Sequence, residues 1–352
     1  MNIPSQPEVA ALLVILHAKL IVEILTFLDV KSLIRMKCVC KSWKTLFSDP
    51  LFVKMHLKRQ STRMTHLALF SKMSQGSVDC RAVPISRLLD TTSNSITLTD
   101  DDPYYQFNFK NARCMVGSCN GLVCLQGCSS DSAAYIDHSF SFWNPATRNI
   151  SETLMSFRQY DNSDPREYIC RFLFGYDNST DTYKVVSFGL KIEDSLMTSS
   201  LLLPRCCEEE LRDPPILPPT LSMLNDCLCF SYDFKKTYFI IWQMKEFGVE
   251  ESWVEFVKIS YLNFQMDYSP RVLVQYGYVP ELIVNPLCVS GNGDMVIFAI
   301  NRLDQVIHYN RRDNRVKRIK SPNQIWWFDA KGYVESLVST SRKYVLFDNL
   351  FV

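Results

Sequence analysis

The first sixty residues repeat apolar side chains three and four positions apart, which is the spacing of one helix face. Asp29 can cap a second helix, which carries apolar residues as far as Val39. Asp49-Pro50 is a strong start signal for a third helix, because Asp accepts bonds from free amides and Pro tolerates the first helical position. The pattern predicts three short helices. The apolar face of the first consists of Leu16, Leu20, Ile21, Ile24, Leu25 and Leu28.

The entry to the first helix is less regular. Ser5 and Glu8 have the spacing of a capping box, so the helix is expected to run from about Gln6 to Thr26. The apolar run from Val9 to Leu16 has no basic residue before it and is too short to span a bilayer. We interpret it as helix, with a secretory signal as the alternative.

Three short helices bury little area by themselves, and this segment has more apolar positions than a three-helix core needs. Such a surplus indicates packing on a partner or on the rest of the same chain. Periodicity alone does not separate the two.

Beyond Met64 the helical period disappears, and short apolar runs alternate with turn signals, which is typical of all-β folds. Asn120-Gly121 is the strongest short hairpin signal, between strands in 115–125. The stretches from Asp90 to Pro103 and from Arg205 to Thr220 read as loops. Further strands are expected at Phe140–Trp143, Phe172–Tyr176, Lys184–Phe188, Cys227–Tyr232, Phe239–Met244, Trp253–Ile259, Met295–Ile300, Val306–Asn310 and Tyr333–Val338.

One turn pattern recurs at Trp143–Asn149, Tyr176–Tyr183 and Tyr309–Arg315. In each, an aromatic residue ends a strand, Asn or Asp opens the turn, and polar residues lead into the next strand. Side-chain oxygens of Asn and Asp can close such turns on their own backbone. A recurring strand–turn–strand unit favours a propeller, with a sandwich as the alternative.

Composition narrows the function classes. The net charge is +1, so no strong field attracts nucleic acid or an anionic membrane, and neither is expected as a partner. The 13 cysteines are odd in number and scattered, which favours reduced thiols in the cytoplasm or nucleus over a disulfide framework. Their spacing suits no common zinc site, so neither a metal nor a cofactor is expected.

Two features could indicate a catalytic or binding site. The segment 117–121 fits Gly-x-Cys-x-Gly, which would make Cys119 a nucleophile with His138 or His308 as its base. The hairpin explains the glycines without chemistry, so no catalytic residue is expected. Trp326-Trp-Phe328 is interpreted as a core strand rather than a binding surface.

Basic residues gather between positions 311 and 320. An exposed turn and strand face is the ordinary explanation. The alternative is a docking patch for an acidic substrate segment or for nucleic acid, with Arg311, Arg312 and Arg315 as its candidate residues.

The N-terminal segment resembles the F-box of plant F-box proteins. The resemblance lies in Leu20–Leu28, Val30–Leu33, Lys37–Trp43 and Ser48–Phe52. It implies docking on a Skp-family adaptor, which connects to a cullin and a RING subunit. The contact would be lined by Leu16, Leu20, Ile24, Leu28, Leu33, Val39, Cys40, Trp43 and Leu46. The segment departs from the family pattern at His17 and Lys19, where Pro and an acidic residue are usual.

The remainder resembles the F-box-associated domain, a kelch-like propeller that binds substrate. The resemblance lies in Ser118–Leu122, Phe142–Arg148, Phe174–Val186 and Phe230–Trp253. The stretch after Val186 is shorter than in the family, so we hypothesise that about one blade is missing.

The expected fold is therefore an α+β multidomain chain, with a three-helix F-box followed by an all-β, kelch-like propeller that lacks about one blade. Its expected segments are a helical extension (1–15), the F-box (16–60), a connector with the first strands (61–113) and the propeller (114–347). The resemblance implies a non-catalytic substrate receptor of a ubiquitin ligase, whose protein substrate is unidentified. The alternative is an interaction protein or decayed paralogue that no longer engages the adaptor.

Overall fold

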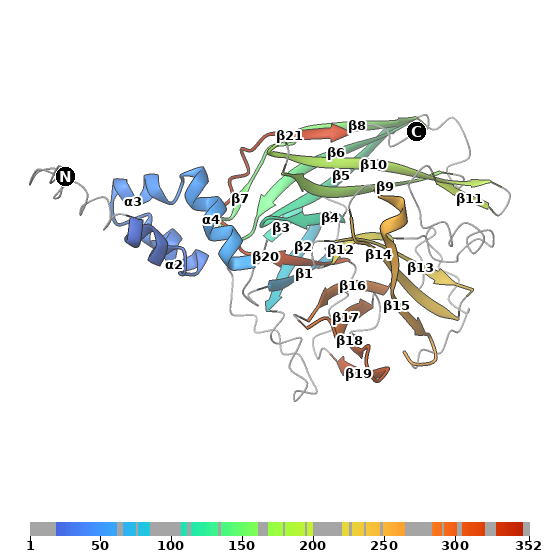
Figure 1. The fold of residues 1–352 in the computed structure, drawn as a ribbon. Coiled ribbons are helices and arrows are strands. Elements are labelled where there is room, and N and C mark those ends of the chain that lie inside the picture. The colour runs from blue at the N-terminus through green and yellow to red at the C-terminus, as the bar shows by residue number, and fades with distance from the viewer. Residues whose placement is uncertain are drawn as a thin grey trace, which may run out of the picture.

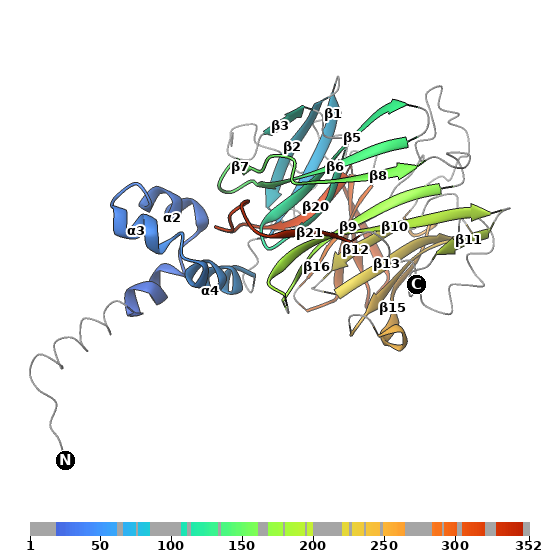
Figure 2. The ribbon, with the colours of Figure 1, turned by 90° about the horizontal axis from the view of Figure 1, so that it is seen from above.

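A short helical segment precedes a large region of β-sheets (Figure 1). The computed structural model describes residues 19–61, 66–74, 77–84, 107–110, 114–132, 135–160, 168–178, 180–193, 196–199, 220–224, 227–235, 237–246, 249–264, 284–290, 292–300, 305–320 and 329–347. Seen from two directions, the helices stand at one side of the sheets, and α4 lies nearest to them (Figures 1 and 2).

The helical segment contains a helix over residues 19–25, then α2 (Val30–Met36), α3 (Lys41–Leu46) and α4 (Pro50–Ser61). Asp29 caps α2 by accepting a bond from the Ser32 amide at 2.7 Å. Asp49 accepts bonds from the amides of Leu51 and Phe52 at the start of α4. Both predicted start signals are confirmed.

The second helix is shorter than predicted, because it ends at Met36 instead of continuing to Val39. Cys40 adopts an extended conformation (φ −156°, ψ 162°) and begins the separate helix α3. The expected three helices are therefore four. The extended residue turns the chain so that Phe47 enters the core at 0% exposure.

The described residues of the β region form five sheets. One sheet has the order β20-β1-β2-β3. Another runs β4-β5-β6-β7, with β8 also paired to β6. In the third, β10 pairs with β9, β11 and β21. The last two are β12-β13-β14-β15 and β16-β17-β18-β19. The bounds are β1 (His66–Ser74), β2 (Ser77–Pro84), β3 (Phe107–Lys110), β4 (Cys114–Cys119), β5 (Leu122–Ser132), β6 (Tyr135–Asn144), β7 (Asn149–Ile150), β8 (Met155–Tyr160), β9 (Tyr168–Asp177), β10 (Thr182–Glu193), β11 (Leu196–Ser199), β12 (Thr220–Leu224), β13 (Cys227–Phe234), β14 (Tyr238–Met244), β15 (Trp253–Ser260), β16 (Val284–Val289), β17 (Met295–Ile300), β18 (Gln305–Asn310), β19 (Arg315–Lys320), β20 (Asp329–Val334) and β21 (Tyr344–Phe347).

The predicted strands and the Asn120-Gly121 hairpin are found in these sheets, with one exception. The strand expected over Tyr333–Val338 stops at Val334, and residues 335–338 are irregular. Three predictions fall outside the described residues. They are the loop from Asp90 to Pro103, the core strand Trp326–Phe328, and the loop from Arg205 except for its last residue, Thr220.

The two ends of the β region are joined by strand pairing. β20, near the C-terminus, pairs antiparallel with β1, the first of the described strands. β21 then pairs parallel with β10. Between sheets, β4 contacts both β9 and β20, and β16 contacts both β12 and β20. Leu173 of β9 packs against the apolar face of the sheet that holds β13 and β14.

The recurring turn has a common backbone geometry. Arg148, Asp181 and Asn314 have positive φ angles of 57°, 52° and 56°, each five residues after the aromatic residue that marks the pattern. Asn144 and Asn310 close their own turns by accepting bonds from amides two or three residues ahead. This confirms the predicted mechanism, in which side-chain oxygens complete the turn.

One core joins the helices to the sheets. Leu33, Phe52 and Val53 belong to the same buried cluster as Phe142 and Leu337. A second cluster lies between the sheets β12–β15 and β16–β19 and includes Ile241, Phe298 and Ile307. The helical segment therefore packs on its own chain, as one of the two sequence-based alternatives proposed.

Candidate interaction surfaces

The helical segment also leaves a large apolar surface uncovered. Leu25 and Val30 point into its core, whereas Ile24 is 63% exposed and Val39 is 70% exposed. Several exposed apolar side chains within one short helical segment are typical of a protein–protein contact. The exposed set is Leu20, Ile21, Ile24, Phe27, Val39, Leu51 and Met55.

The residues predicted to contact an adaptor divide by burial. Leu20, Ile24, Val39 and Cys40 are exposed, and Leu28, Trp43 and Leu46 are half-buried. Leu33 is 0% exposed and packs in the core, so its side chain is not part of the exposed set. Leu16 lies outside the described residues. Sequence reasoning did not assign Phe27, Leu51 or Met55 to this surface, although Phe27 lies three residues after Ile24.

The junction between the helices and the β region is held by charge as well as by packing. Lys54 Nζ of α4 lies 2.8 Å from Asp181 Oδ1 in the turn between β9 and β10. The Tyr176 hydroxyl donates to the same carboxylate. The bonds from Lys54 and Tyr176 hold the pKa of Asp181 below its usual value. The contact with Asp181 raises the pKa of Lys54.

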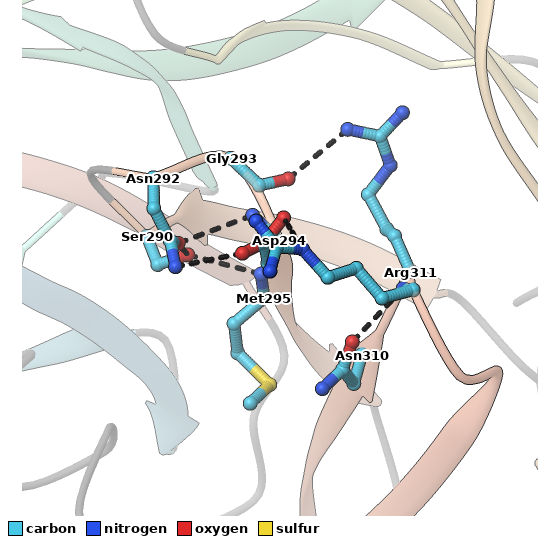
Figure 3. A network of polar contacts seen from close by, with 8 residues as sticks. Ser290, Asn292, Gly293, Asp294, Met295, Asn310 and Arg311 are labelled. Carbon is cyan, nitrogen blue, oxygen red and sulfur yellow. Dashed lines mark hydrogen bonds and ion pairs between the residues drawn. The ribbon is translucent and has the colours of Figure 1, made fainter.

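The predicted basic residues lie in and beside the turn between β18 and β19, and Figure 3 shows Arg311 among them. Arg311 donates from Nη1 to the Gly293 carbonyl at 3.0 Å, and its guanidinium lies 4.2 Å from the centre of the Phe256 ring. Arg312 Nε lies 2.8 Å from Asp294 Oδ1. Arg315 is 85% exposed, and its Nε lies 3.4 Å from Asp313. Each of the three arginines therefore has a partner within the turns, and the ion pair of Arg315 is the longer of the two.

Asp294 owes its position to a polar network in the turn between β16 and β17. Ser290 Oγ accepts a bond from the Met295 amide and donates to Asn292 Oδ1. Asn292 in turn donates from Nδ2 to Asp294 Oδ2 at 2.8 Å, as Figure 3 shows. The carboxylate of Asp294, held in this orientation, forms the ion pair with Arg312.

The possible nucleophile lacks the local structure that it needs. Cys119 ends β4, and the positive φ angles of Asn120 and Gly121 turn the chain directly into strand β5. A nucleophile elbow requires a helix at that point. His138 bonds to Gln126 and packs against Phe172.

Among the described residues, no group of three or more His, Cys, Asp or Glu side chains is placed to hold a metal ion. In the same part of the chain, no helix has the length and apolarity of a membrane span.

Residues 14–55 match the family model described as F-box domain, which confirms the predicted F-box. An F-box/kelch-repeat protein of Arabidopsis thaliana is 32% identical over 172 residues, which cover 47% of this chain and 42% of that protein. The chain thus spans less than half the length of this relative. The F-box protein CPR1 of Arabidopsis thaliana is 21% identical, over 90% of this chain and 87% of its own. A periplasmic gluconolactonase of Pseudomonas aeruginosa aligns at a TM-score of 0.33, with 8% identity over 72% of this chain and 83% of that one.

Proposed function

We propose that this chain, which carries an F-box in front of a β-sheet region, is the substrate-recognition subunit of an SCF-type (Skp–cullin–F-box) ubiquitin ligase. The observation that carries the proposal is the exposed apolar surface around Ile24 and Val39. An adaptor would bury this surface and so gain the hydrophobic stabilisation that folding leaves unused. The adaptor would be of the Skp family and would connect the chain to cullin and RING subunits, in the cytoplasm or nucleus.

We further propose that the five sheets are the blades of one kelch-like propeller. The contacts of β4 with β9 and β20, and of β16 with β12 and β20, follow the order expected of neighbouring blades. Leu173 supplies the remaining contact, between the sheets of β9 and β13. Pairing of β1 with β20 would close the ring between the first and last parts of the chain. Five blades would agree with the loss of about one blade hypothesised from the sequence.

The proposed role needs no catalytic group in this chain. A receptor accelerates ubiquitin transfer by holding a substrate near the enzyme, which is a positioning effect. The buried cluster shared by the helices and the sheets supports this role, because a substrate held on the sheets would then keep a fixed direction relative to the adaptor.

The test is capture of a purified plant Skp-family adaptor by the full-length chain. We expect the double variant Ile24→Asp/Val39→Asp to lower adaptor affinity by at least about tenfold, because it places charge in an apolar contact. Val254→Asp is the matched control, since Val254 is also exposed but lies on β15. Circular dichroism of all variants would exclude unfolding as the cause.

Wild-type chain that fails to bind the adaptor at micromolar concentration would overturn the ligase role. That result would favour the alternative, an interaction protein or decayed paralogue in which the departures at His17 and Lys19 abolish docking. Binding that Val254→Asp weakens as much as the double variant would place the contact elsewhere.

A further inference from the structure

The outermost strand of one sheet combines unpaired backbone with an excess of positive charge. Among the described strands, β19 pairs with β18 alone. An edge strand of this kind presents a row of free amide and carbonyl groups that can pair with an added strand. The described hairpin carries Arg311, Arg312, Arg315, Lys317 and Arg318.

Within the hairpin itself, the acidic residues are too few to balance the basic ones. Asp294 is engaged by Arg312, and Asp313 is the one acidic residue within the hairpin. Arg318 adds a further positive charge, and its Nε and Nη2 are shielded from solvent with no hydrogen-bond acceptor among the described residues. Guanidinium nitrogens left without an acceptor in this way carry an energetic cost.

Two of the basic side chains already have contacts that order them before a partner binds. Arg311 is fixed by the Gly293 carbonyl and the Phe256 ring, and Arg312 is fixed by Asp294. Side chains that are already ordered lose less conformational entropy on binding. Arg315, 85% exposed, extends beyond them at the start of the edge.

We infer that β19 and its turn bind an extended acidic segment of the protein substrate, which adds to the sheet as a further strand. The backbone of the segment would pair with the free edge of β19. Its carboxylates would meet Arg315 and Lys317. This inference rests on the proposed receptor role and names the class of substrate that the β region takes.

An acidic peptide fits better than single-stranded nucleic acid. Nucleic-acid sites of that kind combine basic groups with aromatic rings on which bases stack. The described hairpin has no exposed aromatic side chain, since Tyr309 is 4% exposed and Phe256 lies under Arg311. The net charge of +1 also provides no general attraction for polyanions.

The test measures binding of labelled peptides to the full-length chain by fluorescence polarisation. The probe alternates Glu with Val and Thr over about twelve residues, so that one face is acidic and every amide is present. We expect micromolar binding that weakens as salt rises. A second peptide with the same charges, but with Pro at alternate positions, lacks the amides for strand pairing and should bind at least about tenfold more weakly.

Matched variants locate the site. Arg315→Glu/Lys317→Glu should lower affinity for the acidic peptide by at least about tenfold, and Arg315→Gln/Lys317→Gln should lower it less. Lys235→Glu/Lys258→Glu, on the neighbouring sheet, should change it little. Equal binding of the proline peptide would overturn strand addition. No binding of the acidic probe, or equal binding of a single-stranded oligonucleotide, would overturn the acidic-peptide assignment.

The receptor role is measured separately on the same proteins. Arg315→Glu/Lys317→Glu should bind the Skp-family adaptor like the wild type, since β19 is no part of the F-box. Adaptor binding without peptide binding would reject only this inference. Peptide binding without adaptor binding would reject the ligase role and leave the β19 site in place.

Discussion

Lys54 of helix α4 and Asp181 of the β9–β10 turn form an ion pair at 2.8 Å across the junction between the F-box and the sheets. The two residues are 127 positions apart. Asp181 has a φ angle of 52°, which a turn of this type requires at its last position. One residue therefore completes a local turn and also fixes a distant helix. The pair stands beside an apolar contact that includes Phe52 and Val185.

Asp181→Asn should loosen this junction without changing the turn, because Asn also tolerates a positive φ angle. The pKa of Asp181 is lowered in the folded chain, so its contribution to stability is present above the unfolded pKa of about 3.9 and is lost as pH falls through the folded pKa. We expect the hydrogen-exchange protection of residues 176–178 and 180–183, corrected for the intrinsic pH dependence of amide exchange, to fall more on acidification in the wild type than in Asp181→Asn. An identical response would show that the ion pair does not restrain the turn.

Gly121 tests how closely the C-terminal part of the chain packs on the β4–β5 hairpin. Its φ angle is +79°, and an added Cβ would lie 2.1 Å from Ser336 Oγ. Gly293 has nearly the same φ angle, +77°, but nothing within 4 Å of an added Cβ. Gly293→Ala should therefore cost about 1 kcal/mol from backbone strain alone. Gly121→Ala should lower the free energy of unfolding further, because it also displaces residues 334–336.

Urea unfolding followed by tryptophan fluorescence gives both values. Equal losses for Gly121→Ala and Gly293→Ala would contradict the close approach of Ser336. The comparison is informative because both positions carry the same conformational strain.

Sequence patterns predicted the parts of this fold that depend on neighbours in the chain. Asp29 and Asp49 cap helices through amides two or three residues ahead, and Asn120-Gly121 closes a hairpin between adjacent strands. Contacts between distant segments were missed. The strand expected through Val338 ends at Val334, and beyond it Ser336 Oγ donates to the Asn120 carbonyl, 216 residues away.

The prediction of surface residues was limited in the same way, because contacts between distant segments decide which side chains are exposed. Periodicity placed Ile24 on an apolar helix face but could not show that it is exposed, whereas Leu33 is buried. The basic cluster was visible in the sequence, whereas the attachment of Arg311 to Gly293 and Phe256 depends on how two sheets meet. The type of each side chain can be read from the sequence, whereas its exposure depends on how distant parts of the chain pack together.

Asn144 occupies the same position in its turn as Asn310 but has a second role. Its Nδ2 donates to the carbonyls of Ser336 at 3.0 Å and Val338 at 2.7 Å. Asn144→Ala leaves two buried carbonyl groups without this donor, so the free energy of unfolding should fall by about 2–4 kcal/mol. Asn310→Ala removes only the local turn bond to Arg312 and should cost about 1 kcal/mol.

Urea unfolding of the two alanine variants checks the difference. A loss for Asn144→Ala no larger than that for Asn310→Ala would mean that residues 336–338 do not depend on this amide. Asn144→Asp is a useful third variant, because it keeps the turn acceptor and loses the donor.

Thiol reactivity should differ sharply along the chain. Burial raises the pKa of Cys229 and of Cys288 to about 12, so neither forms thiolate at neutral pH. Cys40 is exposed, and hydrogen bonds from the Ser42 side chain and the Trp43 amide lower the pKa of its thiol. Iodoacetamide at pH 7.5 should therefore modify Cys40 early and leave Cys229 and Cys288 intact until urea unfolds the chain.

Peptide mass spectrometry over time gives the modification rate of each cysteine, and Ser42→Ala should slow the modification of Cys40 alone. Modification of Cys229 as fast as Cys40 in the folded chain would contradict its burial between β12 and β14.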